Sequence, residues 1–283
     1  MKPLEESPVA VLGLGIIGSR VRARLSEAGW SVRCWSRHPK GLDGETTTPE
    51  EAVDGVRLVS IYLKDASAVR AVMTRIADRL GPAHIVLNHA TVDLATTHWL
   101  AACCQERGCG FLDVPFTGSK LAAAAGQLVY YTGGADDLVR QVEPYLRVTG
   151  RDLLPCGGVG AATVIKLATN LVSACTVQAL AEALVLATRH GVTAECLTRA
   201  VAGNFCGSPL AAFKLPTMAA GEFETHFSLD NMRKDSRYSL ELAAAAGLET
   251  PAIRAVSERM TRLCADGLAE LDYSALAKPY LGT

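Results

Sequence analysis

A lysine and an asparagine four residues apart are the pair in this sequence best suited to chemistry. Lys166 and Asn170 lie within residues 161–190, which contain neither proline nor glycine and end before Gly191. This pattern predicts one long helix with a glycine stop, and side chains four residues apart share a helix face. An ammonium beside a carboxamide could act on a bound carbonyl group. A lysine on a helix is ordinarily a solvated surface residue, so the rest of the chain has to overturn that interpretation of Lys166.

Before this helix, short apolar runs alternate with helical patterns, some of which begin at capping residues such as Thr48 and Asp65. Such alternation predicts a doubly wound, mostly parallel α/β sheet with helices on both faces. Ligands in these folds bind at the carboxyl ends of the strands. The glycine cluster at 157–160 ends the alternation, so we expect one domain over residues 1–160. The predicted strands cover residues 9–12, 31–35, 58–63, 85–88, 110–114 and 127–131.

A glycine-rich turn follows the first predicted strand and leads into a helical pattern. It reads Gly13-Leu14-Gly15-Ile16-Ile17-Gly18. The first glycine permits a tight turn, and the second lets a pyrophosphate approach the backbone. The third lets the helix pack closely, with its N-terminus facing the phosphates. In this context the G-x-G-x-x-G pattern predicts a Rossmann domain that binds a dinucleotide, and we expect all six residues to contact it.

The end of the second predicted strand indicates which dinucleotide binds. NAD-binding domains usually place an acid there for the ribose 2′-hydroxyl, whereas this chain reads Ser36-Arg37-His38-Pro39-Lys40. Ser36 can hydrogen-bond a 2′-phosphate, and Arg37 can bind it as a charged fork. The pattern favours NADP(H), with NAD(H) less favoured. Leu63, at the end of the third predicted strand, is also expected to contact the cofactor.

A turn after the fifth predicted strand offers an anion site. It reads Asp113-Val114-Pro115-Phe116-Thr117-Gly118-Ser119-Lys120. Pro115 ends the strand, and Thr117 and Gly118 supply a hydroxyl and backbone N–H groups that can hold a carboxylate without a full opposing charge. A plain turn is the alternative.

The second half, residues 161–283, is predicted to be an all-helical domain joined to the first by the long helix. Glycine and proline breaks separate helical segments at 193–202, 208–220, 230–246 and 251–265. Asp230 could cap the third of these. Lys234 and Asp235 lie one turn further in, where they could face the cofactor edge or simply form a solvated charge pair.

Composition excludes several function classes. The 28 Lys and Arg nearly balance the 29 Asp and Glu without a basic run, so we expect neither a nucleic-acid nor a membrane partner. The apolar segment 171–187 is interrupted by Gln178 and Glu182, which favours a buried helix over a membrane span. Nine scattered cysteines without a CxxC pair or zinc spacing, and a polar start without a signal-peptide pattern, indicate reduced thiols in the cytoplasm.

Taken together, these segments resemble the β-hydroxyacid dehydrogenase family. The family includes 3-hydroxyisobutyrate dehydrogenases, tartronate semialdehyde reductases and glyoxylate/succinic semialdehyde reductases. The motifs that carry the resemblance are, in chain order, GLGIIG, NHATVD, DVPFTGSKLAAAAGQL, VGAATVIKLATN and FSLDNMRKD. Gly118-Ser119-Lys120 and the late ELDYSAL are similar to the glyoxylate/succinic semialdehyde branch.

The resemblance implies a role for each candidate residue. Lys166 corresponds to the catalytic lysine, and Asn170 to the neighbour that orients the substrate oxygen. It also implies a homodimer or homotetramer with the long helix in the subunit contact. The remaining assignments are Thr117 and Gly118 for the substrate carboxylate, Thr91 beside the nicotinamide and the substrate, Phe227 as a pocket wall, and Lys234 and Asp235 as the pair that closes the site.

The implied reaction is the NADPH-dependent reduction of a small carboxylate-bearing aldehyde or ketone, such as glyoxylate or succinic semialdehyde, with Lys166 as general acid. Phe116 replaces the family's usual valine and Thr163 a usual polar amide, so the substrate stays open. An imine reductase usually lacks the lysine, and a non-catalytic NADP(H)-binding protein would not need it. A 6-phosphogluconate dehydrogenase is disfavoured because no histidine directly precedes Lys166 and the chain is short.

Overall fold

The computed structural model describes residues 7–281, and the chain divides into two compact units, Met1–Lys166 and Leu167–Thr283. The division lies inside helix α7 (Ala161–Arg189), which begins in the first unit and continues in the second. The predicted domain boundary after residue 160 lies at the start of this same helix. The predicted helix over 161–190 is thus a single element, and it carries both Lys166 and Asn170.

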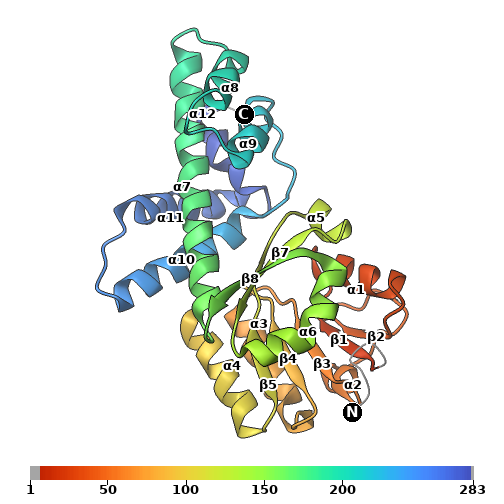
Figure 1. Cartoon of the computed structure of the whole chain (residues 1–283). Helices are drawn as coiled ribbons and strands as arrows, with labels where there is room; N and C mark the ends of the chain where they lie inside the picture. The colour runs from red at the N-terminus through yellow and green to blue at the C-terminus, as the bar shows by residue number, and fades with distance from the viewer. Residues whose placement is uncertain (1–6, 282–283) are drawn as a thin grey trace. The chain divides into compact units, whose positions relative to one another are not determined.

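The first unit contains an eight-stranded sheet in the order β2-β1-β3-β4-β5-β7-β6, with β8 paired to β7 (Figure 1). Strands β1 to β5 pair in parallel, whereas β7 runs antiparallel to β5 and β6 and parallel to β8. This confirms the predicted doubly wound, mostly parallel sheet. The strands are β1 (Val9–Leu12), β2 (Val32–Trp35), β3 (Leu58–Ile61), β4 (Ile85–Asn88), β5 (Gly110–Asp113), β6 (Phe116–Thr117), β7 (Leu128–Gly133) and β8 (Gly150–Gly157).

Side-chain alternation gives this sheet a core on each face. In β1, Val9 and Val11 belong to one hydrophobic cluster and Ala10 and Leu12 to the other, as the period of two along a strand requires. Residues of α1, α5 and α6 fill the first cluster, and residues of α2, α3 and α4 fill the second. These helices are α1 (Gly18–Glu27), α2 (Pro49–Val53), α3 (Ala66–Ile76), α4 (Leu94–Glu106), α5 (Lys120–Ala124) and α6 (Asp136–Thr149).

Side-chain caps begin four of these helices. Thr48, Asp65, Asp93 and Ser119 each accept a hydrogen bond from the backbone N–H three residues further on. Each bond satisfies one of the N–H groups that a helix start leaves without an intrahelical partner. The predicted starts at Thr48 and Asp65 are therefore confirmed.

The carboxyl ends of the five parallel strands are in register. Leu12 pairs with Trp35 and Ile61, Ile61 pairs with Asn88, and Asn88 pairs with Asp113. The segments that follow these residues therefore leave the sheet along one edge. This is the edge where an open α/β sheet binds its ligands, and most of the first unit's candidate residues lie along it.

In residues 167–281, the part of the second unit that the structure describes, helices joined by loops make up the regular structure, with one isolated β-bridge between Ser228 and Asp272. One apolar cluster joins its helices. Ser228 caps α10 by accepting from the Asn231 N–H, so the expectation that Asp230 is the cap is wrong by two residues. The elements after α7 are α8 (Ala194–Ala202), α9 (Pro209–Ala219), α10 (Leu229–Ala245), α11 (Pro251–Leu263), η3 (Cys264–Leu268), η4 (Tyr273–Ala277) and α12 (Lys278–Leu281).

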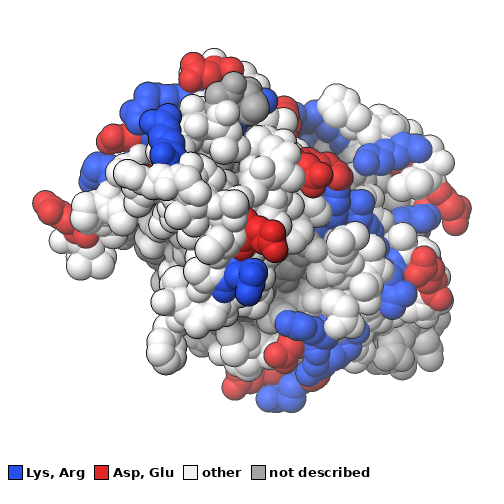
Figure 2. Space-filling view, turned by 90° about the horizontal axis from the view of Figure 1, so that it is seen from above, with Lys and Arg blue, Asp and Glu red and all other residues white. Residues whose placement is uncertain are grey.

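Helix α7 is long and apolar enough to cross a membrane, judged by length and composition alone. One such helix is weak evidence, because the core helix of a soluble protein has the same properties. In α7, Ala174, Val177 and Leu184 belong to the apolar cluster of the second unit. On the face drawn in Figure 2, basic and acidic side chains are interspersed among uncharged residues. All nine cysteines fall within residues 7–281 and are unpaired.

Candidate active site

The glycine turn between β1 and α1 has the geometry that a dinucleotide requires. Gly13 has a φ of +103°, and a Cβ there would lie 2.4 Å from the Tyr62 carbonyl oxygen. A Cβ on Gly18 would lie 1.9 Å from the Gly13 carbonyl oxygen, so both positions need glycine. A Cβ on Gly15 would meet nothing within 4 Å. The middle glycine therefore leaves open space above the backbone, where a pyrophosphate can approach.

The start of α1 also suits an anion. Its N-cap residue, Ile17, makes no side-chain capping bond, and the first turn contains no acid. The first turn of a helix presents N–H groups and the positive end of the helix dipole. Leu14 is buried beneath the turn and Ile16 is exposed above it, while Leu63 packs against Gly13. These residues fit the pyrophosphate and the adjoining part of NAD(P).

The loop after β2 contains an acid that the sequence analysis did not consider. Ser36 Oγ donates to the His38 carbonyl oxygen at 2.7 Å and lies 3.4 Å from Glu45 Oε1. Arg37 is exposed on the same loop. The predicted absence of an acid holds for the strand tip itself, but Glu45 returns to it from nine positions further along the chain. No local motif would have revealed this approach.

The turn expected to hold a carboxylate forms the short strand β6. Thr117 is exposed and pairs with Val129 of β7. Gly118 has a φ of +133°, and a Cβ there would lie 2.9 Å from a methyl group of Leu128, so this position also needs glycine. Ser119 then caps α5. The hydroxyl of Thr117 and the glycine that follows are thus held in an exposed turn, as a carboxylate site requires.

Asp113 and Thr163 fix the first turn of α7 to the edge of the sheet. Asp113 is fully buried and accepts from the Thr163 N–H at 2.8 Å and from Thr163 Oγ1 at 2.9 Å. Thr163 Oγ1 also lies 2.9 Å from Thr97 Oγ1. Burial raises the pKa of Asp113 to about 6, although the hydrogen bonds from Thr163 lower it. Thr163 lies three residues before Lys166, so this bond holds the turn that carries the lysine.

His89 and Thr91 follow β4 at the same sheet edge. His89 is buried, and its Nδ1 lies 2.7 Å from the Val114 carbonyl oxygen, so Nδ1 must carry the proton and donate. Its ring stacks on Tyr62 with 4.3 Å between centroids. Burial lowers the pKa of His89 to about 3. A neutral His89 therefore holds the backbone at Val114, two residues before Phe116, by a hydrogen bond. Thr91, two residues after His89, is half-buried.

In the second unit, three polar candidates meet between α7 and α10. Asn170 Nδ2 donates to Asp235 Oδ2 at 2.7 Å, and the Lys234 ammonium pairs with Asp235 Oδ1 at 2.7 Å. All three residues are buried. Ser239 Oγ donates to the Leu167 carbonyl oxygen at 3.2 Å and binds the two helices one turn further along α10. Asn170, Lys234 and Asp235 thus form one network, one helical turn beyond Lys166.

Phe227 is held by a buried ion pair that the sequence analysis did not find. Lys214 Nζ lies 2.6 Å from Asp272 Oδ1, and both side chains are almost fully buried. Asp272 Oδ2 accepts from the N–H groups of His226 and Phe227 at 3.1 Å, and the Phe227 carbonyl oxygen accepts from the Tyr273 N–H. The one sequence signal for this pair is the segment ELDYSAL, which contains Asp272 but marks a family resemblance and not an ion pair.

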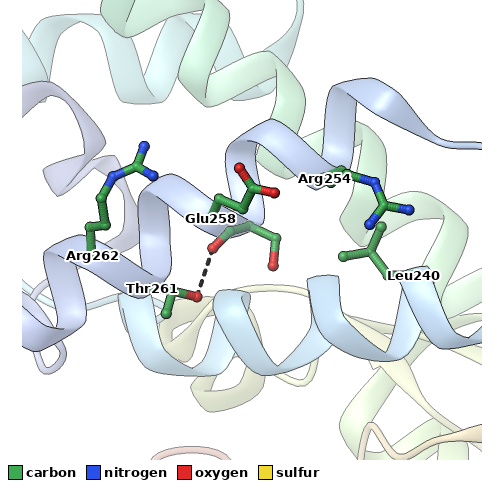
Figure 3. A pocket seen from close by; sticks show the side chains of 6 residues that line it. Leu240, Arg254, Glu258, Thr261 and Arg262 are labelled. Atoms are coloured by element: carbon green, nitrogen blue, oxygen red, sulfur yellow. Dashed lines mark hydrogen bonds between the residues drawn. The ribbon is translucent and has the colours of Figure 1, made fainter.

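A surface hollow between α10 and α11 lies apart from these residues (Figure 3). The side chains of Arg254, Glu258 and Arg262 are exposed, and within the wall Thr261 donates to the Ser257 carbonyl oxygen at 2.8 Å. None of the predicted site residues lines it. Neighbouring charges of opposite sign on an exposed helix are ordinary surface features, so the hollow is no candidate for the active site.

Comparison with known proteins agrees with this geometry. Residues 8–158 match the family model described as the NAD binding domain of 6-phosphogluconate dehydrogenase. Residues 160–280 match the one described as the NAD-binding of NADP-dependent 3-hydroxyisobutyrate dehydrogenase. Glyoxylate/succinic semialdehyde reductase 2, chloroplastic, of Arabidopsis thaliana is 28% identical over 278 residues, which cover 95% of this chain and 78% of that protein.

Solved structures give the same result. The structure of Mycobacterium tuberculosis 3-hydroxyisobutyrate dehydrogenase with L-serine superposes with a TM-score of 0.89 at 27% identity, covering 96% of this chain and 98% of that one. A Streptomyces aurantiacus imine reductase shares the fold, with a TM-score of 0.66 at 22% identity over 96% and 98% of the two chains. The glycine turn, the two-unit fold and the matching family models together show that this chain belongs to the NAD(P)-dependent β-hydroxyacid dehydrogenases.

Proposed function

We propose that this enzyme reduces a small aldehyde or ketone that carries a carboxylate, such as glyoxylate or succinic semialdehyde, with NADPH as coenzyme and Lys166 as general acid. The observation that supports this most directly is the anchoring of α7 on both sides of the lysine. Thr163, before it, is bonded to Asp113, and Asn170, after it, is bonded to Asp235. A catalytic group has to be held this firmly because small displacements reduce the rate strongly.

In this proposal NADPH supplies the hydride, and the protein manages the substrate oxygen. Negative charge grows on that oxygen as the carbonyl carbon is reduced. The Lys166 ammonium stabilises this charge and delivers the proton, a contribution of roughly 10²–10⁴-fold. The Asn170 carboxamide, one turn away, orients the substrate oxygen, and the Thr117–Gly118 turn binds the substrate carboxylate through its hydroxyl and N–H groups.

The choice of NADP(H) over NAD(H) is supported by Ser36 and Arg37, which follow β2 without an acid at the strand tip. Arg37 is exposed and can reach a 2′-phosphate as a charged fork. We place the enzyme in the cytoplasm because all nine cysteines are unpaired thiols. We expect a homodimer or homotetramer, which light scattering on the purified protein measures directly.

Replacement of Lys166 tests the mechanism. Lys166→Ala should lower kcat by at least about 100-fold, since the general acid is lost, while the dissociation constant for NADPH changes little. Val172→Ala is a matched control because Val172 is an exposed residue of the same helix. Turnover of Lys166→Ala near the wild-type rate would refute the assignment.

A coenzyme-oxidation screen identifies the substrate class. Glyoxylate, succinic semialdehyde, tartronate semialdehyde, methylglyoxal and a cyclic imine are each supplied with NADPH and with NADH. The proposal expects the highest kcat/KM for an aldehyde with a carboxylate. Preference for the cyclic imine would instead indicate an imine reductase, and coenzyme binding without any turnover would indicate a non-catalytic binding protein.

A further inference from the structure

We infer that the Glu45 carboxylate limits the preference of this enzyme for NADP(H) over NAD(H), because it places a negative charge beside the Ser36 hydroxyl. The inference rests on the proposed function in one respect: the adenosine ribose of the coenzyme must lie at the end of β2. It concerns coenzyme binding alone and does not depend on which carbonyl compound is reduced.

Glu45 is brought to this position by the backbone. The Cys34 N–H donates to the Gly44 carbonyl oxygen at 2.9 Å, and the Thr46 N–H donates to the Cys34 carbonyl oxygen at 2.8 Å. The chain therefore leaves β2, forms a loop and returns alongside the same strand. Gly44 has a φ of +74°, and a Cβ there would lie 2.2 Å from the Val32 carbonyl oxygen. Only glycine can adopt this conformation at position 44 without a clash, so the backbone fixes the position of Glu45, the next residue.

The loop itself holds the carboxylate. Glu45 Oε2 accepts from the N–H groups of Lys40 and Leu42 at 2.8 and 3.1 Å, and Oε1 lies 3.4 Å from Ser36 Oγ. Desolvation alone would raise the pKa of Glu45, but the backbone hydrogen bonds outweigh it and lower the pKa. The group is therefore ionised near neutral pH. A fixed anion thus lies next to the hydroxyl expected to bind the 2′-phosphate.

The Glu45 carboxylate opposes the favourable contribution of Arg37 to binding of the 2′-phosphate. A 2′-phosphate at Ser36 gains attraction from the exposed Arg37 guanidinium and meets repulsion from Glu45. Coulomb's law for charges about 5 Å apart in a solvated, screened site gives an effect of roughly five- to tenfold on the binding constant. The 2′-hydroxyl of NAD(H) carries no charge and can donate a hydrogen bond to a carboxylate. In NAD-binding domains an acid at this end of the sheet commonly accepts that bond. Glu45 therefore weakens one coenzyme and not the other.

Glu45→Gln isolates the charge from the loop structure. A glutamine oxygen in the place of Oε2 can still accept from Lys40 and Leu42, while the amide group near Ser36 can donate to a phosphate. The dissociation constants of NADPH and NADH are measured without substrate, from coenzyme fluorescence. We expect the ratio Kd(NADH)/Kd(NADPH) to rise roughly five- to tenfold, mainly through tighter NADPH binding.

Asp43→Asn is the matched control, since it removes an exposed carboxylate from the same loop and should change the ratio less than about twofold. An unchanged ratio in Glu45→Gln, or an equal rise in Asp43→Asn, overturns the inference. If Glu45→Gln does not fold, Glu45→Ala provides the second test and must also raise the ratio. A raised ratio in an enzyme without turnover supports the inference and refutes the proposed reaction. Turnover of a carboxylate-bearing aldehyde with NADPH, together with an unchanged ratio in Glu45→Gln, supports the proposed reaction and refutes the inference about Glu45.

Discussion

Replacement of Asp113 by asparagine should change how the stability of the first unit depends on pH. Asp113 is fully buried at the end of β5 and accepts two hydrogen bonds from Thr163. Burial disfavours its charged form more than these bonds favour it, so its pKa rises from 3.8 to about 6 in the folded protein. Asparagine is nearly the same size, keeps one acceptor oxygen and does not titrate.

The sign of the effect follows from proton binding. Between about pH 4 and pH 6 the folded protein keeps a proton on Asp113 that the unfolded chain has lost. Stability from this group is therefore fully present below about pH 4 and is lost as the pH rises through about 6. A difference of about two pKa units corresponds to roughly 3 kcal/mol in the free energy of unfolding.

The comparison of wild type with Asp113→Asn isolates this group, because the other titrating groups are common to both proteins. Urea unfolding can be followed by tryptophan fluorescence, since Trp30, Trp35 and Trp99 all lie in the first unit. The free energy of unfolding of the wild type minus that of the variant should fall by roughly 3 kcal/mol from pH 4 to pH 7. A constant or rising difference would refute the reasoning. Thr163→Val removes a hydrogen bond to the charged Asp113 carboxylate and so raises its pKa further. In that background, the loss of stability that Asp113 causes should occur at higher pH.

Two further predictions concern other buried groups. Asp272→Asn leaves Lys214 buried without its counter-ion, so it should lower the free energy of unfolding of the second unit by about 3–5 kcal/mol. Urea unfolding followed by circular dichroism measures this free energy, and the double variant Asp272→Asn, Lys214→Met should recover part of the loss. Because burial lowers the pKa of His89 to about 3, its ring should stay neutral from pH 5 to pH 8. Its imidazole NMR shifts should therefore be constant over that range, and a titration near pH 6.5 would contradict the burial argument.

Most of the fold could be predicted because its signals are local. The four residues of β1 are buried on both faces, as a continuous apolar run before a glycine turn indicates. β8 was not predicted because seven of its eight residues are exposed or half-buried, and Pro155 interrupts the pattern. Proline is tolerated there because β8 pairs only with β7 and lies at an edge. β6 was missed because it has only two residues.

The candidate site was predictable only where a motif lies within one element. The glycine turn is such a motif, and so is the spacing of Lys166 and Asn170. The partners of these residues come from distant segments: Asp113 binds Thr163 across 50 positions, and Asp235 binds Asn170 across 65. Burial and hydrogen bonding of that kind depend on the tertiary fold, and one sequence carries no local sign of them.

The bond between Asn170 and Asp235 restricts what Asn170 can do. A carboxylate oxygen can only accept, so the group that meets Asp235 Oδ2 has to be the amide nitrogen, and the Asn170 oxygen is left as an acceptor. An ammonium has three donors and no acceptor, so Lys166, one turn away on α7, is a suitable partner for that oxygen. The amide nitrogen keeps a second N–H, because only one is used by Asp235, so the fixed carboxamide can also donate to the substrate oxygen. In the proposed mechanism, Asp235 fixes the amide, the amide orients the substrate oxygen, and the ammonium stabilises the charge that grows on that oxygen.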